Sequence, residues 1–268
     1  MMVAPITQNA KTIRVALLVC GTTIAPVAEN FGLYPALFRT LLLQGLDELK
    51  KLKTVAQDTD LYLEGFDVRE DVYPEELNDW DAIFISGSAS NAYDDIPWIN
   101  KLVQYVKDIP RGKGAPKVVG ICFGHQIIGR AYDARVGKNT RGWELGWTST
   151  DLTEIGQKFW RDTVMRIQEL HQDIVHDVPE GFTLMASTSH TTNQSMISND
   201  STIVSVQGHP EFTGTIMKEF IKARTANGTF SKELSEASMA VVDNPVDNVK
   251  VAARLLEFAL TGLDGGTF

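Results

Sequence analysis

The stretch that most constrains the fold of this chain is residues 120–126, which read Gly-Ile-Cys-Phe-Gly-His-Gln. It follows the apolar pair Val118-Val119, and its two glycines lie two residues either side of Cys122. Glycines at these positions allow a sharp, strained turn between a strand and a helix, which lifts the central side chain to the top of a sheet. The next backbone N–H can then bind an oxyanion, and a thiolate is a better nucleophile than a hydroxyl near neutral pH. The motif therefore predicts a strand–turn–helix unit with a cysteine suited to acyl transfer.

Composition places the chain among ordinary globular proteins and argues against two classes of partner. Of its 268 residues, 43% are hydrophobic and 22% are charged, which is enough for one large domain or two small ones. The formal net charge of -9 argues against nucleic-acid binding, because phosphate recognition needs a basic face. No stretch approaches the roughly 18–20 apolar residues that cross a bilayer, so we expect no membrane partner.

The two cysteines, Cys20 and Cys122, indicate a reduced intracellular compartment and not a disulfide scaffold. Cys20 ends an apolar run, so we expect it to be a small buried hydrophobe. Segment 1–11 lacks the apolar core of a secretory signal, and its lack of acidic residues leaves a mitochondrial address as an alternative to the predicted cytoplasmic location. The cysteines lie far apart in the chain and no Cys/His set has zinc spacing, so neither a metal nor a cofactor is expected.

Apolar, β-branched runs alternate with segments of helical spacing. We expect strands at 15–19, 61–68, 81–85, 117–121, 145–152, 165–170, 183–187, 192–197 and 203–207, and helices at 34–49, 96–107, 124–134, from about 213 and at 246–260. This alternation predicts an α/β fold with a flavodoxin-like, open, mainly parallel central sheet, flanked by helices, with a small antiparallel extension. We expect a single domain at 14–268, with its core at 14–220, a C-terminal helical part at 221–268 and an N-terminal tail at 1–13.

A cysteine nucleophile needs a base, and the chain has five histidines. His209 follows the predicted strand at 203–207, and Glu211 lies two residues beyond it. In an extended segment such residues face the same side, so the carboxylate of Glu211 could hold one imidazole nitrogen while the other faces Cys122. His125 lies closer to the cysteine in sequence, but on the first turn of the helix, where it should point away from the thiol. Ligands gather at the carboxyl ends of parallel strands, and both motifs lie at such ends.

Together, residues 120–126 and the Gln-Gly-His-Pro-Glu segment at 207–211 resemble the motifs of the class I glutamine amidotransferases, the glutaminases with a Cys-His-Glu triad. The resemblance runs from about residue 14 to 220. It implies hydrolysis of a γ-glutamyl amide through a thioester on Cys122. His209 would serve as base and then as acid, with Glu211 as its orienting partner.

The same resemblance implies that the backbone N–H groups of Gly87 and Phe123 form the oxyanion hole, and that Gln126 holds the glutamate end of the substrate. Many family members have Pro-Gly-Gly where this chain has Ser-Gly-Ser at 86–88, yet the glycine that presents its N–H is kept. The segment around His171 resembles the family's Ser-His-x-Asp loop, with Leu170 in the serine position, which suggests that His171 binds substrate. A capping and turn segment is an equal alternative.

Within the family, the turn at 85–88 and the segment 122–126 are most similar to stand-alone γ-glutamyl peptidases of plants and their fungal relatives. We expect no synthetase domain in a chain of this length. The predicted function is hydrolysis of γ-glutamyl amides, either glutamine or γ-glutamyl peptides, with that small molecule as the partner. The alternatives are a glutaminase subunit that delivers ammonia to a separate synthetase partner, and a non-catalytic sensor of a γ-glutamyl ligand. The sequence leaves the leaving group open.

Overall fold

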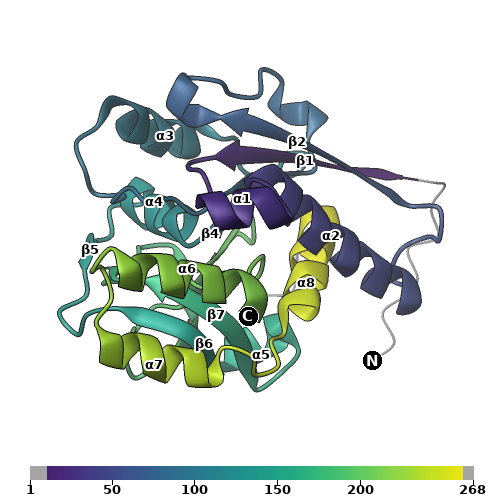
Figure 1. Cartoon of the computed structure of the whole chain (residues 1–268). Coiled ribbons are helices and arrows are strands. Elements are labelled where there is room, and N and C mark those ends of the chain that lie inside the picture. Colours follow the sequence, from purple (N-terminus) through teal and green to yellow (C-terminus); the bar gives the residue numbers. More distant parts are fainter. Residues whose placement is uncertain (1–10, 262–268) are drawn as a thin grey trace.

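One continuous mixed sheet runs through the computed structural model, which describes residues 11–261 (Figure 1). Its nine strands lie in the order β2-β1-β3-β4-β11-β10-β9-β6-β7, and a second sheet pairs β5 with β8. The strands are β1 (Thr12–Val19), β2 (Asp60–Asp67), β3 (Ala82–Ile85), β4 (Lys117–Ile121), β5 (Val136–Lys138), β6 (Glu144–Leu152), β7 (Val164–His171), β8 (Asp173–Val175), β9 (Phe182–Ser187), β10 (Ser195–Ser198) and β11 (Ile203–Val206).

The half of the sheet that carries the elbow is parallel. β1 pairs with β2 and β3, β3 pairs with β4, and β4 pairs with β11, all in parallel. The order β2-β1-β3-β4-β11 is the flavodoxin-like order for five parallel strands. The expected α/β class, with a parallel core, is therefore confirmed. The antiparallel strands β10, β9, β6 and β7 continue the same sheet, and the small separate antiparallel sheet is the β5–β8 pair.

The inner parallel strands β1, β3, β4 and β11 are buried on both faces, as their apolar runs predict, whereas the edge strand β2 is partly exposed. In β1, Val15 and Leu17 contribute to one cluster of buried side chains, whereas Ala16 and Leu18 contribute to another. β3 and β4 divide their side chains between the same two clusters. Because successive side chains of a strand point to opposite faces, the two clusters are the two sides of the sheet.

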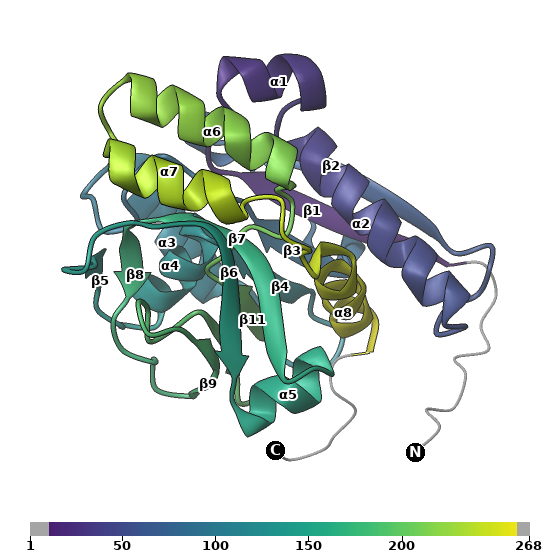
Figure 2. The same cartoon turned by 60° about the horizontal axis from the view of Figure 1, so that its bottom comes forward.

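Helices cover both of these faces. They are α1 (Ala25–Phe31), α2 (Tyr34–Lys51), α3 (Pro97–Asp108), α4 (Phe123–Ala131), α5 (Glu154–Trp160), α6 (Gly214–Ala226), α7 (Lys232–Val241) and α8 (Asn248–Thr261), with 3₁₀ turns at Val68–Glu70 and Leu77–Asp79. α3 and α4 pack on one face, and α2, α6 and α8 pack on the other (Figure 2). The side chains of Thr213 and Ser231 accept backbone N–H groups at the starts of α6 and α7, which caps both helices.

Several boundaries and elements differ from the sequence-based expectation. The hydrophobic periodicity did not reveal α1, α5, α7, β5 and β8, all of them ten residues or shorter. β1 begins at Thr12, so the last two residues of the expected tail belong to the sheet. Residues 1–10 of that tail, and residues 262–268 of the expected C-terminal helical part, lie outside the described residues. Within the described range 11–261, no helix is long and apolar enough to cross a bilayer.

Candidate active site

The backbone makes a strained turn between β4 and α4. β4 ends at Ile121 and α4 begins at Phe123, and Cys122 between them has φ 53° and ψ -104°. A positive φ is uncommon for a residue with a side chain and costs energy, so it persists only where the surroundings impose it. Here the N–H of Cys122 donates to the carbonyl of Val206 in the neighbouring strand β11 at 2.9 Å, which ties the turn to the sheet.

Close backbone approaches explain the two glycines of this elbow. A Cβ on Gly120 would lie 2.6 Å from the carbonyl carbon of Gly124. A Cβ on Gly124 would lie still closer to the carbonyl oxygen of Ile85. Both approaches are closer than any normal contact, so a larger residue would push α4 away from the sheet. The predicted strand–turn–helix unit is therefore present, with Cys122 at the carboxyl end of β4.

His209 reaches the same end of the sheet because it follows β11, the strand beside β4. Its N–H donates to the carbonyl of Gln168 in β7 at 2.8 Å, and its ring stacks on Phe212 with centroids 4.2 Å apart. Its Nδ1 lies 2.8 Å from Oε1 of Glu211. Residues 210–211 form a turn and not the extended segment that we expected, since Pro210 lacks the N–H that would continue a ladder. Glu211 thus reaches the imidazole across a turn.

The surroundings of His209 favour its protonated form. Burial alone lowers the pKa of an imidazole, but negative charge on Cys122 and Glu211, with their hydrogen bonds, outweighs burial and raises the pKa of His209 to about 10. All three side chains belong to residues that are at most 5% exposed. The arrangement suits a thiolate–imidazolium pair with a carboxylate behind the imidazole.

Gly87 and Phe123 both lie beside this pair. A Cβ on Gly87 would lie 2.9 Å from Cε1 of His209, and Phe123 directly follows the cysteine. The first N–H groups of a helix have no partner within the helix, which leaves that of Phe123 free to face an anion. Ser86, which stands where many family members have proline, accepts the N–H of Cys20 at 2.9 Å and donates to the carbonyl of Gly87 at 3.0 Å. These two bonds orient the Gly87 peptide.

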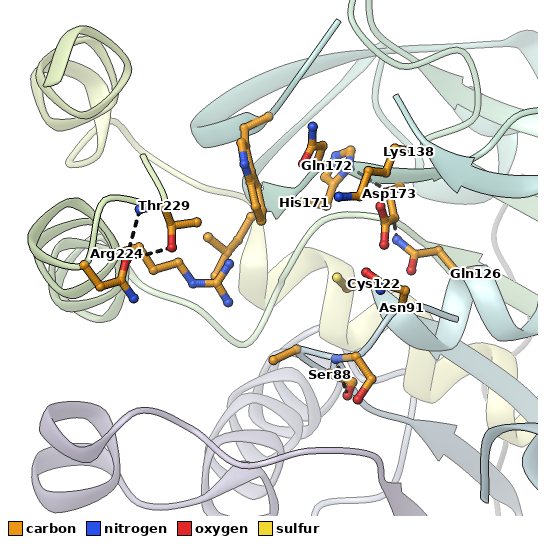
Figure 3. Close-up of a pocket in the computed structure, with 15 residues that line it drawn as sticks. Ser88, Asn91, Cys122, Gln126, Lys138, His171, Gln172, Asp173, Arg224 and Thr229 are labelled. Carbon is orange, nitrogen blue, oxygen red and sulfur yellow. Dashed lines mark hydrogen bonds between the residues drawn. The ribbon is translucent and has the colours of Figure 1, made fainter. Parts of the chain in front are cut away.

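Cys122 lines a cavity of about 370 Å³, whose walls include Gln126 and His171 (Figure 3). Small-molecule pockets typically enclose about 300–1,000 Å³, so this volume suits a small ligand. The side-chain N–H₂ of Gln126 donates to the carbonyl of Asp173 at 2.8 Å and to Oε1 of Gln207 at 3.2 Å. The amide of Gln126 is thus held in a fixed position in the cavity wall.

Both ring nitrogens of His171 face protein groups. Nδ1 lies 3.1 Å from the carbonyl oxygen of Asp173, and Nε2 lies 3.3 Å from Glu144 and 3.2 Å from Glu169. Burial lowers the pKa of this imidazole, but the two carboxylates outweigh burial and raise it to about 10. These contacts favour a positioning role for His171 over direct hydrogen bonding to a substrate.

The side chain of His125 lies on the side of α4 that faces β11. It is fully buried, and its Nδ1 lies 2.8 Å from the hydroxyl oxygen of Ser205. Burial, helped by the charge on His171, lowers the pKa of His125 to about 3. A neutral imidazole bonded to Ser205 is not placed to act on the thiol.

The two sequence motifs, far apart in the chain, thus meet at one site. The family model described as glutamine amidotransferase class-I matches residues 40–226. The chain belongs to the class I glutamine amidotransferase family. The part that matches this amidotransferase model includes the elbow and the turn that carries His209 and Glu211, and it ends at the last residue of α6.

Three amidotransferase relatives illustrate what the chain is similar to. A glutamine amidotransferase-like protein of Schizosaccharomyces pombe is 32% identical over 249 residues, which are 92% of this chain and 98% of that protein. Gamma-glutamyl peptidase 5 of Arabidopsis thaliana is 33% identical over 187 residues, 67% of this chain and 73% of the peptidase. One subunit of a glutamine-hydrolysing GMP synthase from Sulfolobus acidocaldarius is 30% identical over 174 residues, 60% of this chain and 86% of its own length. The relatives therefore include both peptidases and part of a synthase.

A solved structure of a glutamine amidotransferase from Thermotoga maritima has the same fold. It matches with a TM-score of 0.64 and 19% sequence identity, over 92% of this chain and 98% of that chain. At this level of identity the match supports the fold alone.

Several residues of the amidotransferase cavity were not predicted from the sequence. Lys138 at the end of β5, and Arg224 and Thr229 at and after the last turn of α6, also line it. No local motif marks these residues, because they reach the cavity through the packing of β5 and α6. Lys218 and Lys222 are basic residues of the same helix, so no signal in the sequence singles out Arg224.

Proposed function

We propose that this amidotransferase family member is an enzyme that hydrolyses γ-glutamyl amide bonds through a γ-glutamyl thioester on Cys122. The observation that carries the proposal is the buried group of Cys122, His209 and Glu211 beside the cavity, with the cysteine on a strained elbow. The similarity to a γ-glutamyl peptidase supports the identity of the acyl group.

In the proposed reaction, the thiolate of Cys122 attacks the γ-carbonyl carbon, and the N–H groups of Gly87 and Phe123 bind the oxyanion. The C–N bond then breaks while the imidazolium of His209 gives its proton to the leaving amine. In the second half, His209 takes a proton from the water that attacks the thioester. The C–S bond breaks, which releases glutamate and restores the thiolate–imidazolium pair. Glu211 holds one ring nitrogen so that the other faces the sulfur.

The glutamyl group would lie on the side of the cavity that carries Gln126. The bonds from Gln126 to Asp173 and Gln207 hold its amide in place, which supports a fixed binding subsite. His171, held between two carboxylates, would fix the segment that carries Asp173.

The direct test is glutamate release from glutamine, glutathione and γ-glutamyl dipeptides by the purified chain. We expect release from at least one compound and a loss of at least about 10³-fold in Cys122→Ser, which removes the nucleophile. Cys20→Ala is the matched control, because Cys20 is buried at the end of β1 and burial raises the pKa of its thiol far above the usual range. No release from any compound, or release that persists in Cys122→Ser, would contradict the proposal.

The similarity to part of a GMP synthase favours one other candidate, a glutaminase subunit that passes ammonia to a synthetase. Such a protein should be almost inactive alone and strongly stimulated by its partner, since association completes the catalytic arrangement. Full activity of the isolated chain would exclude it. A non-catalytic γ-glutamyl sensor, in contrast, would leave Cys122 unlabelled by a glutamine-like affinity reagent at neutral pH.

A further inference from the structure

Arg224 is a half-buried cation that has no polar partner among residues 11–261. It lies in the last turn of α6 and lines the same cavity as Cys122. Its guanidinium lies over the rings of Trp143 and Phe230, 5.4 and 5.8 Å from their centroids. Within residues 11–261, it has neither an ion-pair partner nor a hydrogen-bond acceptor. Burial lowers the pKa of Arg224, and only the nearby Cys122 and Tyr34 oppose this effect.

Partial burial without a polar partner among residues 11–261 distinguishes Arg224 from the other arginines that are withdrawn from solvent. Those side chains all have polar partners: Arg69 bonds to Asp67, Arg130 to Asn100, Arg166 to Asp247, and Arg254 to Glu257. Withdrawing a charge from water is costly unless another group compensates it. Aromatic faces compensate Arg224 in part, and its five N–H donors are left for a ligand in the cavity.

The position of Arg224 indicates which part of a ligand it would meet. Figure 3 shows Arg224 on one side of Cys122, and Gln126 and Asp173 on the other. If the γ-glutamyl group occupies the Gln126 side, as the proposed function has it, the amine attached to the γ-carbonyl extends past Cys122 toward Arg224. A guanidinium there would bind a carboxylate with two parallel hydrogen bonds.

We infer that Arg224 binds a carboxylate of the leaving amine, and that the substrates are therefore γ-glutamyl amino acids or peptides. This inference rests on the proposed hydrolysis at Cys122. Glutamine releases ammonia, which has no carboxylate and leaves Arg224 unpaired. A γ-glutamyl amino acid releases an amine whose carboxylate meets the guanidinium, so the same site discriminates between the two.

The test compares γ-glutamylalanine with its neutral amide, γ-glutamylalaninamide, which differs only in the charge of the leaving group. We expect the wild-type chain to prefer the acid by about 10- to 100-fold in kcat/KM, the usual worth of hydrogen bonds to a charged partner. Arg224→Met keeps an unbranched side chain over Trp143 and should bring the ratio close to one. Arg224→Lys should keep part of the preference, because it keeps the charge and loses the paired donors. Lys222→Met, on the exposed face of the same helix, should leave the ratio unchanged.

The outcomes separate the two proposals. If neither compound yields glutamate while glutamine does, only the inference about Arg224 is overturned. If glutamine and glutathione yield none either, the proposed hydrolysis fails and this inference fails with it. If both are hydrolysed equally well by the wild-type chain, only the inference about Arg224 is overturned, and that result needs no variant. If Arg224→Met lowers both rates by the same factor, Arg224 acts on the thiolate or on the γ-glutamyl end, which also overturns the inference.

Discussion

The two cysteines of this chain show how local geometry separates a reactive thiol from an inert one. Both are buried, and each directly follows a strand of the sheet. Cys20 follows the last residue of β1 and its thiol donates to the carbonyl of Leu18, and burial raises the pKa of that thiol. Cys122 has a positive φ and lies beside His209, whose protonated form the site favours. The chemistry thus depends on the neighbours of the thiol and not on its exposure.

The pKa of His209 leads to a prediction for the pH profile. His209 must carry a proton to give to the leaving amine, so kcat/KM of the wild-type chain should fall above about pH 10, the pKa of that imidazole. Glu211→Gln removes a carboxylate that raises this pKa, so the fall should begin at a lower pH. Loss of the orienting partner should also lower kcat/KM by about 10²–10⁴-fold.

The measurement is kcat/KM for one γ-glutamyl dipeptide between pH 6 and 11. Glu219→Gln, whose carboxylate lies on α6 and pairs with Lys222, is the matched control and should match the wild-type profile. An unchanged basic limb in Glu211→Gln would show that Glu211 does not set the proton affinity of His209.

Among the elements, the join between β4 and α4 tolerates the least change. An alanine at Gly120 would place its Cβ against the backbone of Gly124, so Gly120→Ala should destabilise the fold by about 1–3 kcal/mol, as overpacking does. Gly137→Ala is the control, because its new Cβ would meet only Nε2 of His176 at 3.6 Å, an ordinary contact. Urea unfolding followed by circular dichroism measures both. Equal stability of the two variants would mean that the elbow is not as tightly packed as the distances indicate.

Besides the side chains at Cys122, a second cluster of buried charged side chains lies at the end of β7. His171 lies between Glu144 and Glu169, so His171→Leu would leave two buried carboxylates without their cation and should cost about 3–5 kcal/mol. The pKa of His171 is raised from 6.5 to about 10 on folding. Its contribution to stability should therefore be complete below about pH 6.5 and decline as the pH rises toward 10.

Unfolding midpoints in urea at pH 6.5, 8 and 9.5 test this pH dependence. The gap between the wild-type chain and His171→Leu should narrow as the pH rises. A gap that stays constant would show that His171 contributes through packing and not through charge.

The elements with a clear apolar run or apolar stripe were predictable from the sequence, and those without one were not. β4 was predicted with the bounds that it has, because a short apolar run between a polar loop and a glycine turn is a clear signal. α7 was missed because the buried residues on it are Ser235 and Ser238, which form no apolar stripe. Its cap at Ser231 was the one local indication.

Some residues of the candidate site were likewise predictable from the sequence, and others were not. Cys122, His209 and Glu211 were predictable because each lies in a motif at the end of a strand. Arg224 was not, since its place in the cavity depends on how α6 packs over the antiparallel strands. The contact between His209 and Glu211 was predicted, but by way of an extended segment where the structure has a turn.

Over the whole molecule, the site depends on one sheet that joins parallel and antiparallel halves. β11 lies between β4, which ends at the elbow, and β10, the first of the antiparallel strands, and it leads directly to His209. Because these strands share hydrogen bonds, we expect the two halves to unfold together.

This cooperativity is testable with three probes in urea: circular dichroism, tryptophan fluorescence and the alkylation of Cys122. Their midpoints should coincide. An antiparallel half that unfolds first, while Cys122 stays protected, would contradict the view that the two halves form one cooperative unit.

The most direct test of the proposed thioester chemistry is the mass of the chain after brief exposure to γ-glutamyl compounds and acid quench. We expect a mass increase of one γ-glutamyl group, located by fragmentation at Cys122 and not at Cys20, and labile to hydroxylamine as a thioester is. The adduct should accumulate in His209→Ala or Glu211→Gln if these changes slow hydrolysis of the thioester more than its formation. An unmodified Cys122 after exposure to compounds that the chain hydrolyses would contradict the thioester mechanism.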